Sequence, residues 1–384
     1  MDLNEMTDVR NPVPTPGVPR LPNIYALTSV RFFAALYVAL YHMVRPFSLW
    51  GPLADVMAAG YLGVSFFFVL SGFILTYSHA AEYESGMGDR GRFWVARLAR
   101  VYPVYLLSML FSAYVTRSQF RPLWHAIAFA ADLLMVQSWS MRMVNFFNVP
   151  AWSLSTEAFF YLTFPFLLLL IRPSTRLRGW AWVFGMWVLA MAAPLYSAIH
   201  YPLASFSESA PVSAVGSEFV YHVRKIPLFA LPEFLAGVSL GWIYLRFRPS
   251  KQMLFCMAMA GVVALMGALA FVGRLPLIML HNGLLIPVYV LLILGLCGGH
   301  WLSRLLENKV MVLLGEASFA LYLTHFLFND WLTQQFGVKT DLQAVVWKLA
   351  IVIPVSMLLN LYVERPGRTL ILTIWKKWRM AAAI

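Results

Sequence analysis

Charged residues are scarce in this chain of 384 residues. Asp, Glu, Lys and Arg together make up 12% of the sequence and hydrophobic residues 60%, whereas soluble globular domains carry about 25% charged residues. One water-soluble core cannot bury so much apolar surface, so the composition excludes a soluble protein. At about 20 residues per crossing, the chain has room for ten or so membrane-spanning helices.

Cysteine and acidic residues are also few. The two cysteines, Cys256 and Cys297, lie in apolar stretches, which excludes a disulfide framework and a cysteine-based zinc site, so we expect no metal ion. The 17 acidic residues face 29 Lys and Arg, which gives a net charge of +12. The basic residues form short clusters between apolar stretches, which is typical of membrane topology signals and not of a nucleic-acid-binding groove.

Eleven apolar runs are candidates for spans. If all five basic clusters face the cytoplasm, an even number of spans must separate each neighbouring pair, and only the interval 100–172 breaks this rule because it holds three runs. The weakest of the three, 123–140, is interrupted by His125, Asp132 and Gln137, so we predict a re-entrant or interfacial segment on the outer side. The runs are 24–44, 57–78, 101–116, 123–140, 152–171, 179–199, 226–246, 252–272, 277–298, 311–331 and 343–364.

The predicted fold is an all-α integral membrane bundle of about ten transmembrane helices plus one re-entrant or interfacial segment. Residues 1–22 are rich in proline and are predicted to form a disordered cytoplasmic tail. Residues 23–370 form the membrane domain and residues 371–384 a basic cytoplasmic tail, so both termini are expected in the cytoplasm. The loop 200–225 then faces outward.

Arg31 and His42 are ionisable residues inside the first run, where a charge costs roughly 2.5–3.5 kcal/mol. They are eleven positions apart, which places them on one helix face with an axial separation of ~16 Å. Two interpretations stay open. Arg31 reaches the interface and His42 is a satisfied helix-end residue, or both belong to one polar track through the membrane with His42 as a base.

Arg97 and Arg100 lie three residues apart in RFWVARLARVYP, at the start of the next predicted helix. Two guanidinium groups on one face of a helix N-terminus suit a phosphorylated ligand. Plain anchoring of the helix at a positive cytoplasmic surface explains them equally well.

Glu157 follows Ser153 and Ser155 in PAWSLSTEAFFYLTFP. One of the serines could cap a helix whose positive end Glu157 complements. Alternatively, Glu157 orients and stabilises the imidazole of His42 from a neighbouring helix.

Ser318, Tyr322 and His325 form a polar stripe on an otherwise apolar helix near the C-terminus. Such a stripe favours a proton relay or the binding of an acceptor. Glu364 and Arg365, at the end of the last run, are interpreted as an interfacial structural pair.

Small residues are concentrated in the second run, GYLGVSFFFVLSGFIL. Gly60, Gly63 and Gly72 would let neighbouring helices approach closely, as small residues do in membranes.

Six segments, taken in chain order, resemble the acyltransferase 3 family of membrane O-acyltransferases over about residues 24–368. Some members carry an appended SGNH hydrolase-like domain, which this sequence is expected to lack. The resemblance implies an enzyme of about ten spans. It moves an acetyl or similar short acyl group from cytoplasmic acyl-CoA to a hydroxyl of an extracytoplasmic acceptor, usually a carbohydrate. The segments are LTSVRFFAALYVALYH, GYLGVSFFFVLSGF, RFWVARLARVYP, AWSLSTEAFFYLTFP, LLGEASFALYLTH and YVERP.

The resemblance also implies roles for particular residues. His42 matches the essential histidine of the first span and Arg31 its partner arginine. Arg97 and Arg100 match the RxxR element associated with the acyl-CoA donor. The glutamate of WSLSxE is Glu157, and the late histidine of YLxH is His325.

We therefore predict an acyl-CoA-dependent O-acetyltransferase of the plasma (inner) membrane. Acetyl-CoA is its donor substrate and no cofactor is permanently bound. Its expected partners are membrane lipids and a carbohydrate acceptor of surface polysaccharide. The alternatives are a proton-coupled transporter or exporter of a polar lipid or sugar and a non-catalytic scaffold. The transporter is less favoured because the two halves of the chain show no repeat.

Overall fold

The structure is a computed structural model that describes residues 21–44, 51–115, 122–206, 215–337 and 342–382. Within these ranges the chain is helical and contains no strand, and ten of its helices are long and apolar enough to cross a membrane. The predicted all-α bundle is thereby confirmed, and the protein is a multi-pass integral membrane protein. Nearly all of the predicted N-terminal tail, residues 1–20, lies outside the described residues.

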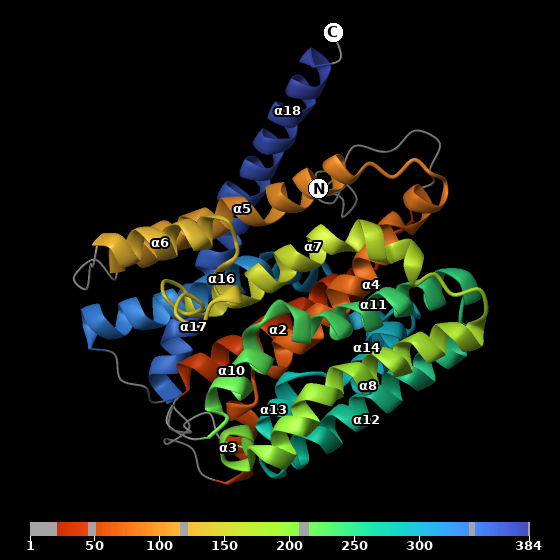
Figure 1. Ribbon diagram of the computed structural model, residues 1–384, viewed down its shortest axis with the longest axis horizontal. Coiled ribbons are helices and arrows are strands. Elements are labelled where there is room, and N and C mark those ends of the chain that lie inside the picture. Colours follow the sequence, from red (N-terminus) through yellow and green to blue (C-terminus); the bar gives the residue numbers. More distant parts are fainter. Residues whose placement is uncertain (1–20, 45–50, 116–121, 207–214, 338–341, 383–384) are drawn as a thin grey trace.

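The long helices run side by side, from lower left to upper right in Figure 1, and short helices cover their ends. The spanning segments contain α2 (Tyr25–Met43), α4 (Leu62–Glu84), α5 (Arg90–Val115), α7 (Trp152–Leu170), α8 (Arg176–His200), α11 (Pro227–Phe247), α12 (Lys251–Ala270), α13 (Leu277–His281) with α14 (Ile286–Leu296), α16 (Lys309–Phe336) and α17 (Leu342–Leu359). The short elements are α3 (Pro52–Ala58), α6 (Pro122–Leu133), η3 (Gln137–Trp139), η4 (Val149–Ala151), α9 (Pro202–Phe206), α10 (Ser217–Lys225), η5 (Val272–Arg274) and α15 (Trp301–Leu306).

The segment 123–140 does not cross the bundle as a span. Helix α6 has 12 residues, or about 18 Å of helix, against a hydrocarbon core of about 30 Å. The chain then turns back, and the Tyr105 hydroxyl donates to the Asp132 carbonyl (2.8 Å) while the Gln137 amide donates to the Ala151 carbonyl (3.0 Å). The prediction of a non-spanning segment is confirmed, whereas its placement on the outer side stays a prediction.

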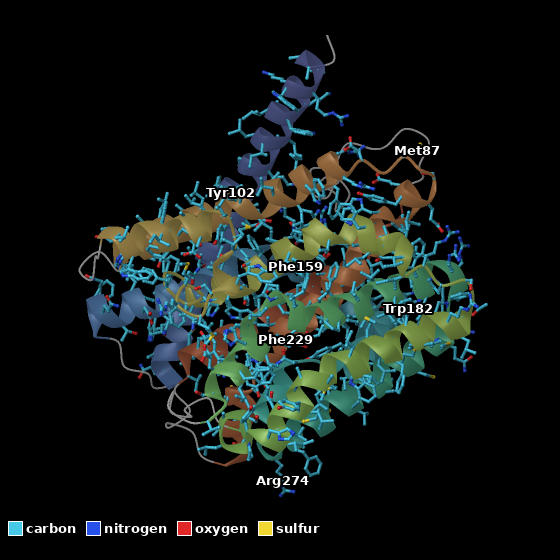
Figure 2. All side chains as sticks on the ribbon, viewed as in Figure 1. Met87, Tyr102, Phe159, Trp182, Phe229 and Arg274 are labelled. Atoms are coloured by element: carbon cyan, nitrogen blue, oxygen red, sulfur yellow. The ribbon has the colours of Figure 1, made fainter. Side chains whose placement is uncertain are left out.

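Several interhelical turns meet at one end of the bundle, which we call the basic end. Glu84, at the end of α4, pairs there with Arg172 (2.8 Å), which follows α7, and with Arg246 (3.0 Å) near the end of α11. In Figure 2, Met87 lies at the basic end and Arg274, which follows α12, lies at the opposite end.

Helices α4 and α11 cross in close contact. A Cβ atom on Gly72 would lie 2.1 Å from the Phe234 carbonyl oxygen, and one on Gly237 would lie 1.9 Å from that of Val69. No larger residue fits at either position without moving a helix. The predicted role of Gly72 in close helix approach is confirmed.

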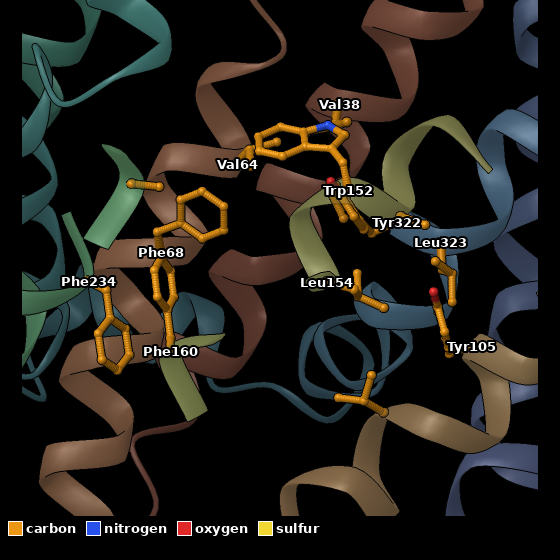
Figure 3. Packing of buried hydrophobic residues seen from close by; sticks show 14 of the residues in the cluster. Val38, Val64, Phe68, Tyr105, Trp152, Leu154, Phe160, Phe234, Tyr322 and Leu323 are labelled. Carbon is orange, nitrogen blue, oxygen red and sulfur yellow. The ribbon is translucent and has the colours of Figure 1, made fainter. Parts of the chain in front are cut away.

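Aromatic rings join α4, α7 and α11 beside this crossing. Phe160 stacks on Phe234 with ring centroids 4.6 Å apart, and Phe68 meets Phe160 edge to face at 5.2 Å. Figure 3 shows these three rings together, with Leu154 and Tyr322 on the other side of the same cluster. Offset and edge-to-face ring pairs add about 0.5–1.5 kcal/mol each beyond area burial. Helix α7 is thus held rigidly, with Glu157 one turn before Phe160.

The helix that contains the last span does not end at residue 364. Helix α17 continues through a π-helical turn, η6 (Asn360–Glu364), into α18 (Arg365–Ala381), which projects beyond α5 in Figure 1. Most of the expected basic tail is therefore helical. Its cytoplasmic location stays a prediction.

Glu364 and Arg365, which were predicted to pair, interact electrostatically, but each has its direct partner elsewhere. Arg365 donates to Glu316 at 2.5 Å, and Glu364 accepts from the Asn360 side chain at 3.0 Å. Consecutive residues of a helix point about 100° apart, so these two side chains face different neighbours.

Candidate active site

A cavity inside the bundle is lined by three converging arginines. Arg31 comes from α2, and Arg97 and Arg100 come from α5, opposite Glu157 of α7. The cavity has a solvent-accessible volume of about 90 Å³. Its other polar side chains are Ser71, Ser153, Tyr161, Ser318 and Tyr322, and its apolar wall is Val64, Phe67, Phe68, Leu70, Ile74, Leu75, Val101, Leu154 and Phe319. We call it the arginine pocket.

The two arginines of the RxxR element do not lie at a helix start. Helix α5 begins at Arg90, eleven residues before the start expected from hydropathy, because its first turns are too polar to register as part of an apolar run. Arg97 is therefore inside the bundle and only 9% exposed. The expectation that the helix N-terminus assists these arginines is wrong.

The three arginines lack direct counter-ions. Among the described residues, Arg31, Arg97 and Arg100 make no salt bridge and no hydrogen bond, and the Nε atom of Arg97 is buried without an acceptor. Glu157 accepts instead from Ser71 at 3.1 Å and from the Tyr161 hydroxyl. Because a buried charge needs a hydrogen-bonded partner, a cavity with three such guanidinium groups suits an anionic ligand.

Two further charged residues, Glu364 and Arg368, belong to this cluster. The sequence analysis assigned Glu364 to an interfacial pair and did not single out Arg368 as a site residue. Glu364, on the π-helical turn, interacts electrostatically with Arg31, Arg100 and Arg368. Four arginines and two carboxylates, including Glu157, sum to a formal charge of +2. A signal was present in the sequence, since Asn360, Glu364 and Arg368 recur every four residues along one helix face.

His42 and His325 form a hydrogen-bonded pair, with His42 Nδ1 3.1 Å from His325 Nε2. His325 Nδ1 is 3.2 Å from the Leu321 carbonyl, which can only accept, so Nδ1 carries the proton and Nε2 is the acceptor. His42 Nδ1 then carries a proton as well, which also faces the Val38 carbonyl at 3.0 Å. The lone pair of a neutral His42 is consequently on Nε2, which is the form that a general base requires.

The arginine pocket ends at Tyr322, one turn before the histidine pair. The Tyr322 hydroxyl lies 2.6 Å from the Ser153 hydroxyl and 3.1 Å from the Pro150 carbonyl. Its ring centroid is 6.0 Å from that of His325. The expected polar track from Arg31 to His42 is therefore interrupted here, because neither histidine lines the pocket.

The structure brings together most of the predicted site residues, but it separates Glu157 from His42. Glu157 lies among the arginines, and His325 is the residue that contacts the His42 ring. The capping alternative for Ser153 also fails, since its hydroxyl is bonded to the Pro150 carbonyl (3.0 Å) and to Tyr322. The catalytic and binding roles of these residues stay predictions.

The polar stripe of α16 continues beyond His325. Asn329, one turn further on, accepts from the buried ammonium of Lys348 on α17 at 2.8 Å, and Thr333 lies 3.0 Å from the same nitrogen. Lys348 was not singled out from the sequence because a single lysine in an apolar run is usually interfacial. In the described part of the chain, no three His, Cys, Asp or Glu side chains are grouped to hold a metal ion.

Comparison with known proteins defines the class. Residues 24–365 match the acyltransferase domain that characterises the acyltransferase 3 family, so the chain belongs to this family and is a membrane acyltransferase. It is 30% identical to acyltransferase MdmB of Streptomyces mycarofaciens over 324 residues, which is 80% of each chain.

Two staphylococcal relatives are longer. A putative O-acetyltransferase of Staphylococcus aureus strain COL and the O-acetyltransferase OatA of strain NCTC 8325 are each 25% identical, over 79% and 78% of this chain. These matches cover 50% and 49% of the relatives, so the chain spans about half of their length. No solved structure matches.

Proposed function

We propose that this acyltransferase moves a short acyl group, such as acetyl, from acyl-CoA to a hydroxyl group of a carbohydrate. The observation that carries the proposal is the set of three arginines that line one cavity without direct counter-ions, next to a histidine pair whose tautomers leave a basic nitrogen on His42. The names of the relatives, acyltransferase and O-acetyltransferase, support the reaction class.

The arginine pocket would bind the anionic part of the donor. Its formal charge of +2 suits a diphosphate diester, which carries two negative charges. Guanidinium groups bind phosphate through paired N–H donors. Glu157, held by Ser71 and Tyr161, would keep Arg31 and Arg97 apart and oriented, since both interact with it electrostatically.

His42 would be the general base. Its Nε2 takes the proton from the acceptor hydroxyl as the oxygen attacks the thioester carbonyl. The carbon–sulfur bond then breaks, and the proton passes from His42 to the leaving thiolate. His325 would accept a hydrogen bond from His42 Nδ1–H throughout, and so stabilise the imidazolium form. For the thioester to reach His42, the Tyr322 side chain must rotate away from Ser153.

The positions of the basic residues support the orientation. Arg172, Arg176 and Arg246 lie at the basic end, which we assign to the cytoplasm by the distribution of positive charge. Acyl-CoA would enter from that side, and both termini would be cytoplasmic. The acceptor, for which we propose a surface polysaccharide outside the plasma membrane, would approach His42 from the opposite end.

The test is transfer of radiolabel from [14C]acetyl-CoA to cell envelopes by the purified, lipid-reconstituted protein. His42→Ala should lower the transfer rate about 100-fold or more, in the range for loss of a general base. His200→Ala, which alters an exposed histidine at the end of α8, is the control and should leave the rate unchanged. A transporter would leave acetyl-CoA intact, and undiminished transfer by His42→Ala would exclude this residue as the base.

A further inference from the structure

A second cavity lies between α5 and α7, between the arginine pocket and the surface of the bundle. Arg97, Val101, Leu154, Glu157 and Tyr161 line both cavities and separate them. The remaining residues of the second cavity are all apolar. They are Trp94, Val95, Leu98, Met135, Ala158 and Leu162. We call this cavity the lateral recess.

The lateral recess opens toward lipid and is closed at both of its ends. Leu98 and Leu162 are 45% and 54% exposed and form its mouth. At the basic end, the Trp94 indole donates to the Tyr161 carbonyl at 3.1 Å and joins α5 to α7. At the opposite end, Met135 closes the recess.

The dimensions of the recess limit its occupant. From Trp94 to Val101, α5 rises about 10 Å, at 1.5 Å per residue. One leaflet of a bilayer is about 15 Å thick, half of a 30 Å hydrocarbon core. The recess is therefore too short for a whole lipid tail and long enough for a short or medium acyl chain.

The shared wall also favours a ligand with one polar and one apolar part. Its polar members, Arg97, Glu157 and Tyr161, line both cavities, whereas the other residues of the recess are all apolar. Leu154 follows Ser153, which is bonded to Tyr322 at the end of the pocket. A chain attached to a thioester near Tyr322 would thus meet Leu154 first and then the recess.

We propose that the lateral recess binds the acyl chain of the donor, so that the protein accepts thioesters with acyl groups longer than acetyl. This inference rests on the proposed function, because it places an acyl-CoA in the arginine pocket. Burial of each methylene contributes about 0.8 kcal/mol, which corresponds to an affinity gain of about fourfold per methylene until the recess is full.

The experiment measures the dissociation constants of CoA, acetyl-CoA, butyryl-CoA, hexanoyl-CoA and octanoyl-CoA for the protein in lipid nanodiscs. Wild type should bind the longer donors more tightly than acetyl-CoA. Leu98→Trp, which fills the mouth of the recess, should remove this gain and leave acetyl-CoA affinity unchanged. Leu107→Trp is the matched control, since Leu107 lies on the same helix, is 41% exposed and does not line the recess.

The outcomes separate the two proposals. Equal affinity of wild type for all four thioesters, or a chain-length gain that survives Leu98→Trp, overturns the inference and leaves the proposed function intact. A uniform loss with every donor in Leu98→Trp assigns the recess to the acceptor or to a bilayer lipid, and also overturns it. Failure of every CoA derivative to bind would instead contradict the proposed function.

Discussion

Glu157 and Glu233 are both carboxylates within the membrane bundle, but their surroundings differ. Glu233, on α11, is 1% exposed and accepts from the Ser65 hydroxyl at 2.7 Å and from the Gly283 backbone. It links α11 to α4 and to the turn between α13 and α14. Glu157 lines a cavity and faces arginines that lack direct counter-ions.

The difference shows that burial of a charge does not by itself mark a site. Glu233 is buried, and Ser65 donates to its Oε2 atom, while its Oε1 atom is buried without a side-chain donor. Around Glu157, the guanidinium groups lie further from the carboxylate than in an ion pair, and they surround an open volume. The functional signal is therefore the combination of convergent charge and space, which supports placing the donor at Glu157 and a structural role at Glu233.

Of the changes that compare the two regions, replacing both Arg97 and Arg100 by alanine should have the largest effect. Each charge-assisted hydrogen bond contributes about 1.5–3 kcal/mol, so the dissociation constant of acetyl-CoA should rise about 100-fold or more. Calorimetry with acetyl-CoA measures it. Arg178→Ala, in an exposed arginine of α8, is the control, and an equal effect there would show that general surface charge attracts the donor.

The crossing of α4 and α11, next to Glu233, should lose stability when one methyl group is added. Gly237→Ala places a Cβ 1.9 Å from the Val69 carbonyl oxygen, so α4 and α11 must separate, at a cost of about 1–3 kcal/mol or more. The melting temperature should fall by several degrees. Gly267→Ala on α12, where nothing lies within 4 Å, should leave it unchanged. A stable Gly237→Ala protein would contradict the close crossing.

Isosteric amide substitutions compare the two carboxylates directly. Glu157→Gln removes the negative charge that balances Arg31 and Arg97, and kcat/KM for acetyl transfer should fall about tenfold, or about 1.4 kcal/mol. Glu233→Gln keeps the shape of a residue that does not line the pocket, so kcat/KM should change less than twofold. A larger loss in Glu233→Gln than in Glu157→Gln would reverse our assignment of the two regions.

The sequence predicted the helices and several site residues because these depend on local rules. A bilayer demands long apolar runs, so the spans and the short segment 123–140 could be identified. Ser318, Tyr322 and His325 recur at helical spacing, and the structure places them on one face of α16. Arg97 and Arg100 share a face by the same rule.

The contacts between helices could not be predicted in this way. Glu157 was expected at His42, but the packing of α7 against α4 and α11, set by Phe160 and Phe234, directs it to Arg31 instead. The π-helical turn that brings Glu364 to the arginines depends on how α17 packs. Glu233 has no feature in the sequence that separates a structural acid from a catalytic one.

Asp132 and Asp89 lie outside the spans and offer a second comparison between two carboxyl groups. The pH dependence of the protein's stability can distinguish them. Burial raises the pKa of Asp132 to about 7, although the neighbouring Tyr105 hydroxyl acts in the opposite direction. Burial also acts on Asp89, but hydrogen bonds from the Arg92 N–H and from Arg379 outweigh it and hold the pKa of Asp89 below its usual range. One carboxyl is thus packed and the other is paired.

The two residues should have opposite effects on stability as the pH rises. Folded Asp132 holds its proton more tightly than the unfolded chain, whose pKa is about 3.9, so its contribution is greatest below pH 4 and is lost as the pH approaches 7. Asp132→Asn should therefore melt a few degrees above wild type at pH 8 and show a smaller difference at pH 5. Asp89 contributes at pH values above about 4, so Asp89→Asn should melt below wild type at both pH values. Equal behaviour of the two variants between pH 5 and pH 8 would mean that Asp132 is hydrated. The segment after α6 would then not pack against α5 and α7 as the hydrogen bonds of Tyr105 and Gln137 require.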